Sequence, residues 1–498
     1  MMSNFDNSAP VIIGVGEASR KTVPGEWPRP VDLAGQAIKF ALADTGQAHA
    51  VSAAIDTIAA IRTFEDSGVS LGTGSPDNTP EAFGAAGGIS ARNLIYADIG
   101  GQSPQAMVHE MAGAIRRGET QVAIIVAAEA TGTAKRARKA GIELDWRLPS
   151  QTAFDNRLSS FPILSRNEIR HGIISMPLAY SLLENARRLG LGISREDYLV
   201  HMAELSAAMS VKSLTREHAQ FAKHFTTRDL MRDHESDYRL TDIYRRWRVA
   251  QDAVDLGGAI LLTSAGKARE MGVSDDKMVW LAGASETKEP PYSERADILH
   301  ACALDYALHA ALDQAGVAAT DLGPVDIYSC FPVAVYGAVD TLGDPTRSLG
   351  DYTLTGGLNF FGGPGNGYAT YSIAAMVDAL RSDGSKPALV TANGGVMSKQ
   401  AVGIYTALQP AQPWMGDVAT GYQAKSVELD STPQGKGKIL TYARPVSKDQ
   451  IGAATLLIAM ENGTRAMAVL EDVADIELGG MIVNVTPQEK RHSATIYC

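Results

Sequence analysis

Short apolar runs alternate with helical patterns through the first 130 residues. Residues 11–16, 55–61 and 121–130 are continuous apolar runs, as in strands that are covered on both faces. Residues 31–46 and 103–117 instead carry apolar side chains at the spacing of a helix that packs along one face. This alternation predicts an α/β fold with a mostly parallel sheet between helices.

The same order of elements returns about 270 residues later along the chain. A helical pattern at 299–316 precedes an apolar run at 325–331, and a second pattern at 368–384 precedes a run at 387–395. These two pairs match, in order, the helix–strand pairs of the N-terminal part. The ordered similarity predicts two copies of one α/β unit.

Residues 131–250 interrupt this pattern. They contain helical patterns at 176–190 and 194–211, together with many charges. An excursion of this length predicts a helical segment that packs over the core and covers a site, or one that is tolerated at the surface.

The character of the chain changes again after residue 410. Short apolar runs alternate with turns there, and Asn462-Gly463 is a tight hairpin signal. A small antiparallel β module is therefore expected at the C-terminus. The predicted division is an N-terminal half at 1–275, a C-terminal half at 276–408 and the β module at 409–498.

Composition narrows the class of protein. The chain has 498 residues and 45% hydrophobic content, which exceeds what one hydrophobic core usually holds, so we expect several folding units. A formal net charge of −11 argues against nucleic acid or an anionic membrane as a partner. The N-terminus does not have the pattern of a secretion signal, and no run reaches the roughly 20 apolar residues of a membrane span. We expect a cytoplasmic protein without membrane insertion.

The cysteines lie far apart in the sequence. Cys302, Cys330 and Cys498 form no C-x-x-C pair and no cysteine–histidine spacing that is typical of a metal ligand set. The sequence therefore predicts neither a disulfide framework nor a metal site.

The turn G-G-Q-S-P-Q at 100–105 stands directly before a predicted helix. Ser103 is a suitable N-cap and Pro104 a suitable first helical residue. This places Gly100, Gly101 and Gln102 ahead of the helix, where free N–H groups can hold a carboxylate, phosphate or thioester oxygen. The alternative is a well-capped core helix without a ligand.

Three further turns follow candidate strands or lie between a strand and a helix. One is the glycine-rich stretch 356–371, which contains Gly363, Asn366 and Tyr371. The others carry Ser329 with Cys330, and Asn393. Open α/β sheets bind ligands at the carboxyl ends of their strands, and a duplicated sheet brings such turns together. For Cys330 the alternative is an inert buried thiol, because no base stands next to it in the sequence.

With these motifs the sequence resembles the thiolase superfamily, and within it the sterol-carrier-protein-2-like (SCP2) thiolases and the type 1 thiolase-like proteins. The resemblance covers residues 9–408, and residues 410–498 resemble the extra OB-like β domain of the type 1 proteins. It implies a duplicated thiolase fold with five layers, αβαβα, and a helical loop domain at about 131–250.

The resemblance also implies roles for residues. Thiolases carry a nucleophilic cysteine in a C-x-S/T-G-x-Q-A motif, and matching Gln105-Ala106 to its end puts Gly100 at that cysteine. The family's H-D-C-F loop matches Tyr328 to Phe331, so Cys330 corresponds to the acid–base cysteine. The G-H-P loop matches residues 362–364, with Gly363 in place of the oxyanion-hole histidine. The C-x-G loop matches residues 391–393 and has no cysteine.

Without a thiolate at position 100, no covalent acyl intermediate can form there. The resemblance then implies an acyltransferase, similar to acetyl-CoA acetyltransferases, that acts on CoA thioesters by Claisen or retro-Claisen chemistry. Cys330 would act as a general base, and the N–H groups of 100–102 with the amides of Asn366 and Asn393 would stabilise an enolate or oxyanion. The candidate helpers are Ser329, Tyr371 and Lys399.

Two other functions stay open at this stage. The protein can be a non-catalytic acyl-CoA-binding or complex-stabilising member of the family, or a thioester hydrolase. In each case coenzyme A or acyl-CoA is the expected ligand, with no tightly bound cofactor. The resemblance places the protein in lipid metabolism, as a monomer or homodimer, with a heteromeric partner as a further alternative.

Overall fold

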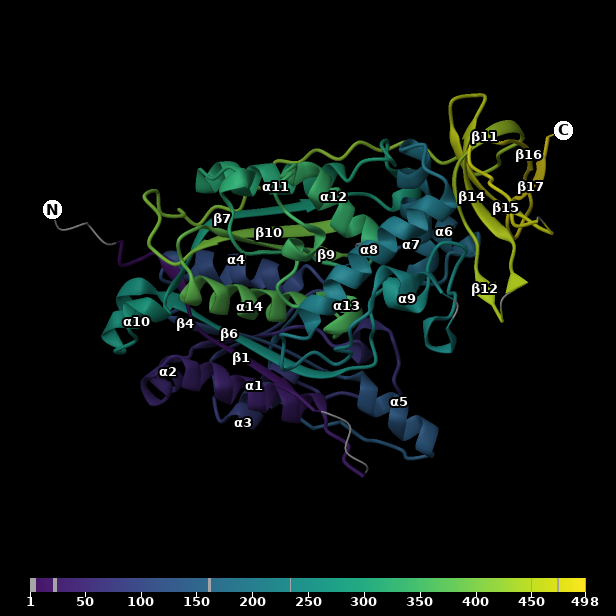
Figure 1. The fold of residues 1–498 in the computed structure, drawn as a ribbon. Helices are drawn as coiled ribbons and strands as arrows, with labels where there is room; N and C mark the ends of the chain where they lie inside the picture. Colours follow the sequence, from purple (N-terminus) through teal and green to yellow (C-terminus); the bar gives the residue numbers. More distant parts are fainter. Residues whose placement is uncertain are drawn as a thin grey trace.

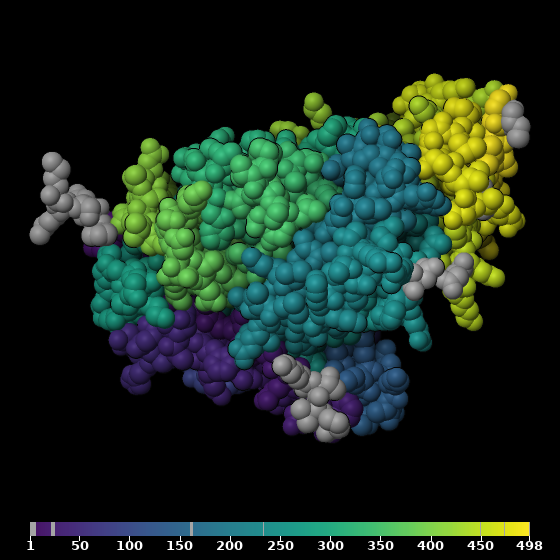
Figure 2. Space-filling model, in the orientation of Figure 1, coloured from purple at the N-terminus to yellow at the C-terminus, as the bar shows by residue number. Residues whose placement is uncertain are grey.

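The computed structural model describes residues 6–20, 25–159, 163–232, 234–448, 450–472 and 474–497. Two α/β halves lie on top of each other, a helical segment packs beside them, and a small β barrel stands at one end (Figure 1). Figure 2 shows the helical segment, in blue and teal, between the C-terminal half and the yellow barrel.

The N-terminal half contains six strands and the helices that pack around them. The strands are β1 (Pro10–Ser19), β2 (Thr57–Ala60), β3 (Asn93–Tyr96), β4 (Val122–Ala130), β5 (Asp155–Asn156) and β6 (Asp255–Ser264). The helices are α1 (Pro30–Asp44), α2 (Ala48–Ala54), α3 (Thr79–Gly87), α4 (Ser103–Arg116), α5 (Thr131–Ala140) and α10 (Ala265–Glu270). An ideal Cβ at Gly16 would lie 2.2 Å from the carbonyl oxygen of Ala37, so glycine is what allows α1 to pack directly on β1.

The C-terminal half repeats this arrangement. Its strands are β7 (Val279–Lys288), β8 (Val325–Asp326), β9 (Ala388–Gly394) and β10 (Lys399–Thr406). Its helices are α11 (Cys302–Ala315), α12 (Pro332–Leu342), α13 (Gly357–Phe360) and α14 (Tyr368–Ser382). Short 3₁₀ helices lie at Glu65–Ser67, Glu235–Asp237, Arg246–Arg248, Asp275–Lys277, Tyr292–Glu294, Ala319–Asp321 and Leu349–Tyr352.

The strands of both halves form one hydrogen-bonded sheet in the order β5-β3-β2-β4-β6-β1-β7-β10-β9-β8. The halves join where Val11 and Ile12 of β1 pair with Trp280 and Val279 of β7. The sheet folds over so that α4 and α14 lie between its two parts, with α1–α3 outside one part and α11 and α12 outside the other (Figure 1). The predicted duplicated α/β fold with αβαβα layers is confirmed. The prediction of a mostly parallel sheet was wrong, because the central strands β6, β1, β7 and β10 pair antiparallel with their neighbours.

An apolar core fills the middle layer. Val108 and Met111 of α4 and Ile373 of α14 lie in one buried cluster with inward side chains of both sheet parts, such as Ile125 and Leu281. This cluster fixes α4 between the sheets, and with it the turn that precedes α4.

The helical segment carries α6 (Arg166–Arg170), α7 (Met176–Gly190), α8 (Arg195–Ser213) and α9 (Thr227–Met231). The helices predicted at 176–190 and 194–211 are therefore present. Tyr180, Leu183 and Tyr198 of α7 and α8 share a buried apolar cluster with α12 of the C-terminal half. In the described part of the chain, no helix combines the length and the apolar composition that a membrane crossing requires.

The C-terminal module is a closed barrel in the order β11-β14-β15-β17-β16. Its strands are β11 (Gly435–Ala443), β14 (Ala454–Met460), β15 (Arg465–Leu470), β16 (Ile482–Thr486) and β17 (Ser493–Ile496), with a β12 (Val446–Ser447) and β13 (Gln450–Ile451) hairpin beside them. The predicted Asn462-Gly463 turn joins β14 to β15, and Gly463 has a φ of 86°, which favours glycine. The exact domain division at 275 and 408 stays a prediction.

Two local predictions were wrong. The run at 325–331 forms a strand only at Val325–Asp326, because the amide of Ile327 already donates to the carbonyl of Tyr352, outside the sheet. Helix α4 starts at Ser103 with Gln102 as its N-cap. Ser103 does not cap the helix, because its hydroxyl donates to the carbonyl oxygen of Asp98 at 2.6 Å.

Candidate functional site

The four turns singled out in the sequence meet at one place between the halves. The amide of Gly100 donates to Oδ1 of Asn366 at 3.0 Å. An ideal Cβ at Gly101 would lie 2.1 Å from the hydroxyl of Tyr328 and 2.5 Å from the carbonyl oxygen of Asn393. The convergence expected of a duplicated sheet is therefore present, and the turns touch so closely that position 101 has room only for glycine.

The side chain of Gln102 fills the space beside Gly100. An ideal Cβ at Gly100 would lie 2.0 Å from Oε1 of Gln102, and Gly100 has a φ of 136°, which L side chains rarely adopt. The same oxygen is buried without a hydrogen-bond partner among the described residues. The Gln102 side chain is flexible and can move away, but the backbone of this turn does not suit a reactive side chain at position 100.

The turn still offers two N–H groups. The amide of Gly100 is occupied by Asn366, but those of Gly101 and Gln102 have no hydrogen-bond partner in the described part of the chain. Two of the three expected N–H groups are thus available at the start of α4, where the helix dipole favours an oxygen with negative charge.

Tyr180 of α7 covers Cys330. Its ring stacks on Phe331 with centroids 4.0 Å apart, and the thiol of Cys330 donates to its hydroxyl at 3.4 Å. The same hydroxyl accepts from the amide of Met397 and from Nδ2 of Asn393, both at 3.2 Å. The hydroxyl also donates to the carbonyl of Gly395 at 3.0 Å, so ring stacking and four hydrogen bonds hold Tyr180 on the thiol. Sequence reasoning missed it, because the segment at 176–190 shows a helical pattern and no signal for what lies beneath it.

Burial controls the chemistry of Cys330. Its removal from water raises the pKa of the thiol to about 12, despite hydrogen bonds from its surroundings that act in the opposite direction. A thiol with this pKa stays protonated at neutral pH and is a poor nucleophile. The arrangement is that of a sealed thiol, which weakens the predicted role of Cys330 as a general base.

Asn366 and Asn393 have different surroundings. Asn366 uses its whole amide inside the protein, since Nδ2 donates to the carbonyl of Arg62 and the hydroxyl of Ser67 while Oδ1 accepts from Gly100. Asn393 donates to Cys330 Sγ at 3.5 Å, and its Oδ1 is buried without a partner among the described residues. Asn366 therefore holds the turn together, whereas Asn393 keeps an acceptor for a ligand or a water molecule.

Two other predicted residues pack against other elements. The amide of Gly363 donates to the carbonyl of Gln251 at 2.7 Å, so this glycine faces the end of the helical segment. Tyr371 is fully buried, and its ring packs 5.3 Å from Phe361 and next to Gly258 of β6.

The predicted helpers have structural partners. The hydroxyl of Ser329 accepts from the amide of Leu358 at 3.1 Å. Nζ of Lys399 binds Oδ2 of Asp98 at 3.1 Å and the carbonyl of Ile99 at 3.0 Å. These contacts explain why both side chains are buried: they position the turns around the site.

A cavity of about 500 Å³ is lined by residues of α7 and α12, and we call it the α7–α12 cavity. Leu183, Val333 and Met397 form apolar parts of its wall, and Cys302 and Gln400 also line it. Met397 links this cavity to the cluster around Cys330, because its amide donates to the hydroxyl of Tyr180 at 3.2 Å.

A second cavity, of about 450 Å³, lies on the other side of the turn and is called the α4 cavity. It is lined by Gln102, Ser103 and Lys399, and by His109, whose Nδ1 lies 3.0 Å from Oε1 of Glu286. Polar and paired charged groups dominate its wall.

Comparison with known proteins identifies the fold and the family. No protein-family model matches the chain. No curated protein sequence matches it either. Among solved structures, a monomeric SCP2-thiolase-like protein of type 1 from Mycobacterium smegmatis has 32% identity and a TM-score of 0.82, over 99% of this chain and 100% of that chain.

Two more distant structures share the fold alone. The dimeric peroxisomal thiolase of Saccharomyces cerevisiae has 15% identity and a TM-score of 0.57, over 81% of this chain and 98% of that chain. The Ltp2-ChsH2(DUF35) aldolase has 18% identity and a TM-score of 0.57, over 80% of this chain and 98% of that chain. The full-length similarity to the mycobacterial structure is decisive: the chain belongs to the SCP2-thiolase-like proteins of type 1, within the thiolase superfamily.

Proposed function

We propose that this protein binds a CoA thioester without forming a covalent acyl-cysteine. The observation that carries the proposal is the turn before α4, where glycine stands at position 100 and the Gln102 carboxamide occupies the space beside it. Covalent acyl transfer needs a thiolate at that point. The free amides of Gly101 and Gln102 can still hold the thioester oxygen at the start of the helix.

The α7–α12 cavity suits the acyl part of such a ligand. Its volume of about 500 Å³ lies within the range of small-molecule sites. Its two arginines already have acidic partners, Arg187 with Asp340 at 2.9 Å and Arg295 with Glu289 at 3.3 Å. An uncharged chain fits this wall better than the phosphates of CoA, because the arginine charges are already neutralised in place.

A second candidate function is Claisen or retro-Claisen acyl transfer, or thioester hydrolysis, with Cys330 as the general base. The observation that favours it is Asn393, which donates to Cys330 Sγ and keeps a free Oδ1 within the same cluster. For this chemistry Tyr180 must first move off the thiol, and the pKa of Cys330 must fall.

Thermal unfolding with CoA, acetyl-CoA and a series of longer acyl-CoAs tests the first proposal. A ligand at 100 times its Kd should stabilise the protein by about 2.7 kcal/mol. Val333→Trp, which fills the α7–α12 cavity, should weaken the binding of longer acyl-CoAs more than the binding of CoA. Val418→Trp, in the α4 cavity, should not produce this difference. The absence of a shift with any CoA compound would contradict the proposal.

Release of free CoA from the same thioesters, followed with a thiol dye, separates the two functions. We expect no turnover by the wild type and unchanged binding by Cys330→Ala. Turnover that disappears in Cys330→Ala would instead establish the second function.

The protein is also expected to be a monomer. The sheet ends in two-residue strands, β5 (Asp155–Asn156) at one edge and β8 (Val325–Asp326) at the other. Edge strands as short as these offer few free backbone groups for extending the sheet into a second copy. Light scattering on the purified protein should give a mass near 52.8 kDa, and a mass twice as large would show that another surface forms a dimer.

A further inference from the structure

Helix α7 contacts the candidate site with one face and the C-terminal barrel with the other. Tyr180, Leu183, Glu184 and Arg187 follow the helical repeat and point to one side. On that side Tyr180 covers Cys330, Leu183 and Arg187 line the α7–α12 cavity, and Glu184 accepts from the amide of Val333 at the start of α12 at 3.0 Å. One face of a single helix therefore shapes both the sealed thiol and the cavity.

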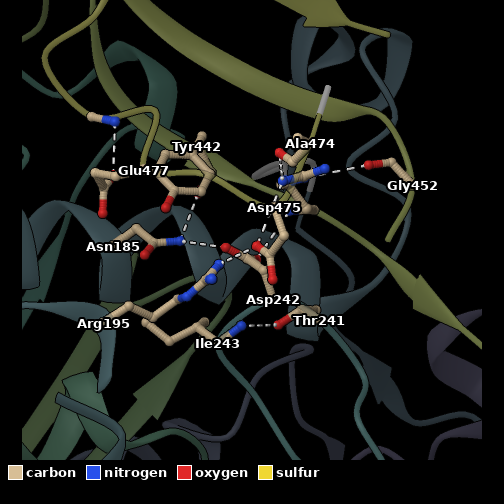
Figure 3. A network of polar contacts seen from close by, with 12 residues as sticks. Asn185, Arg195, Thr241, Asp242, Ile243, Tyr442, Gly452, Ala474, Asp475 and Glu477 are labelled. Carbon is tan, nitrogen blue, oxygen red and sulfur yellow. Dashed lines mark hydrogen bonds and ion pairs between the residues drawn. The ribbon is translucent and has the colours of Figure 1, made fainter. Parts of the chain in front are cut away.

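The other face of α7 binds the C-terminal barrel through buried polar groups (Figure 3). Nδ2 of Asn185 donates to the carbonyl of Tyr442 in β11 at 3.0 Å and to Oδ2 of Asp242 at 3.3 Å. Asp242 in turn exchanges backbone and side-chain hydrogen bonds with Arg444, at 3.0 and 3.2 Å. Asn185, Asp242 and Arg444 are each at most 3% exposed, so water cannot replace these partners.

Further contacts join α7 and α8 to the barrel around this centre. The hydroxyl of Thr441 donates to the carbonyl of Leu182 at 2.6 Å, and Arg188 binds Glu477 at 2.7 Å. Arg195 of α8 binds Asp475 at 2.6 Å. The barrel thus holds α7 along its outer face, through main-chain and side-chain bonds.

We propose that the C-terminal barrel positions α7, and that this contact keeps Tyr180 on Cys330 and sets the wall of the α7–α12 cavity. A rigid helix cannot shift one face and leave the other in place, so a displaced barrel moves Tyr180, Leu183 and Arg187 together. Asn185 is the central positioning residue, because it binds the barrel and Asp242 with one amide group. The inference rests on geometry and does not require that the ligand be a CoA thioester.

Alkylation of Cys330 by iodoacetamide in the native full-length protein, followed by peptide mass spectrometry, tests this coupling. Asn185→Ala should raise the rate at Cys330 by about tenfold or more, because the displaced helix admits water and reagent. Thr441→Val keeps the shape of the side chain and removes one hydrogen bond, so we expect a smaller increase of about threefold. Arg491→Ala, which removes an exposed ion pair with Glu471 on the barrel, is the matched control and should leave the rate unchanged.

Amide hydrogen exchange in β11 reports whether the barrel has loosened in each variant. Faster exchange in β11 together with faster alkylation of Cys330 supports the inference. Faster exchange in β11 with an unchanged rate at Cys330 overturns it, because the barrel would then move without the site. If Asn185→Ala does not fold, the same two measurements on Thr441→Val alone test the inference.

Discussion

Replacing Tyr180 with alanine is expected to raise the alkylation rate of Cys330 by about 10²- to 10³-fold near pH 8. The ring of Tyr180 lies on Phe331 and its hydroxyl binds the thiol, so its loss uncovers Cys330. Water then reaches the sulfur, and the pKa falls from about 12 toward the ordinary value of a cysteine. Since only the thiolate reacts, the thiolate fraction sets the rate.

Peptide mass spectrometry after timed exposure to iodoacetamide measures this rate. Cys302 on the cavity wall serves as an internal standard in the same sample. Tyr352→Ala removes another buried tyrosine of the same apolar cluster and serves as the control. It should destabilise the protein to a similar extent but leave the alkylation of Cys330 slow. Equal rates for Cys330 and Cys302 in the wild type would show that the thiol is open, and Cys330 would again be a candidate base.

The periodicity of the chain was sufficient to predict the architecture. The helical patterns at 103–117 and 368–384 became α4 and α14, which occupy equivalent places between the two parts of the sheet. Their apolar positions recur at helical spacing because both helices are buried. The strand predicted at 325–331 was mostly lost, because apolar composition alone does not distinguish a strand from a buried turn whose amides bind elsewhere, as that of Ile327 does.

The meeting of the four turns followed from topology and could be predicted, but their chemistry could not. Position 100 as glycine is visible in the sequence, whereas the Gln102 oxygen beside it depends on how the turn folds. Tyr180 comes from a helix 150 residues before Cys330, and nothing in its local pattern indicates that contact. Likewise, the place of Tyr371 in a glycine-rich stretch did not indicate that its ring packs against Phe361 and next to Gly258 of β6.

These features together describe a thiolase fold in which two of the predicted site positions are crowded or covered. The Gln102 carboxamide lies beside Gly100, and Tyr180 covers Cys330. The N–H groups of Gly101 and Gln102 and the cavity beside α7 remain available. The proposed non-covalent binding of a thioester would use these groups, and the proposed barrel contact with α7 would hold that cavity in shape.

Glu129→Gln is expected to abolish a large pH dependence of stability. Glu129 ends β4 and is 3% exposed, and its burial raises the pKa of the carboxyl to about 8. Because this pKa lies above the unfolded value of 4.5, the native carboxyl is protonated, and its contribution is fully present below about pH 4.5 and is lost as pH rises through 8. The loss is on the order of 3–5 kcal/mol. A glutamine is neutral throughout and can still accept from the amide of Phe64, as Glu129 does at 2.7 Å.

The measurement is the midpoint of urea unfolding of the wild type and of Glu129→Gln between about pH 5 and 8.5. The stability of the wild type should fall across this window. Glu129→Gln should keep the smaller slope of the other buried carboxyls, such as Glu17 and Asp242, whose pKa values burial raises to about 7 and about 6. Glu119→Gln, an exposed exchange, is the control and should follow the wild type. Parallel curves for wild type and Glu129→Gln would mean that Glu129 is ionised when folded.

Glu129 also touches the candidate site, because an ideal Cβ at Gly365 would lie 2.5 Å from Oε1 of Glu129. This carboxyl therefore supports the turn that carries Asn366. Its ionisation should loosen the candidate site before the protein unfolds.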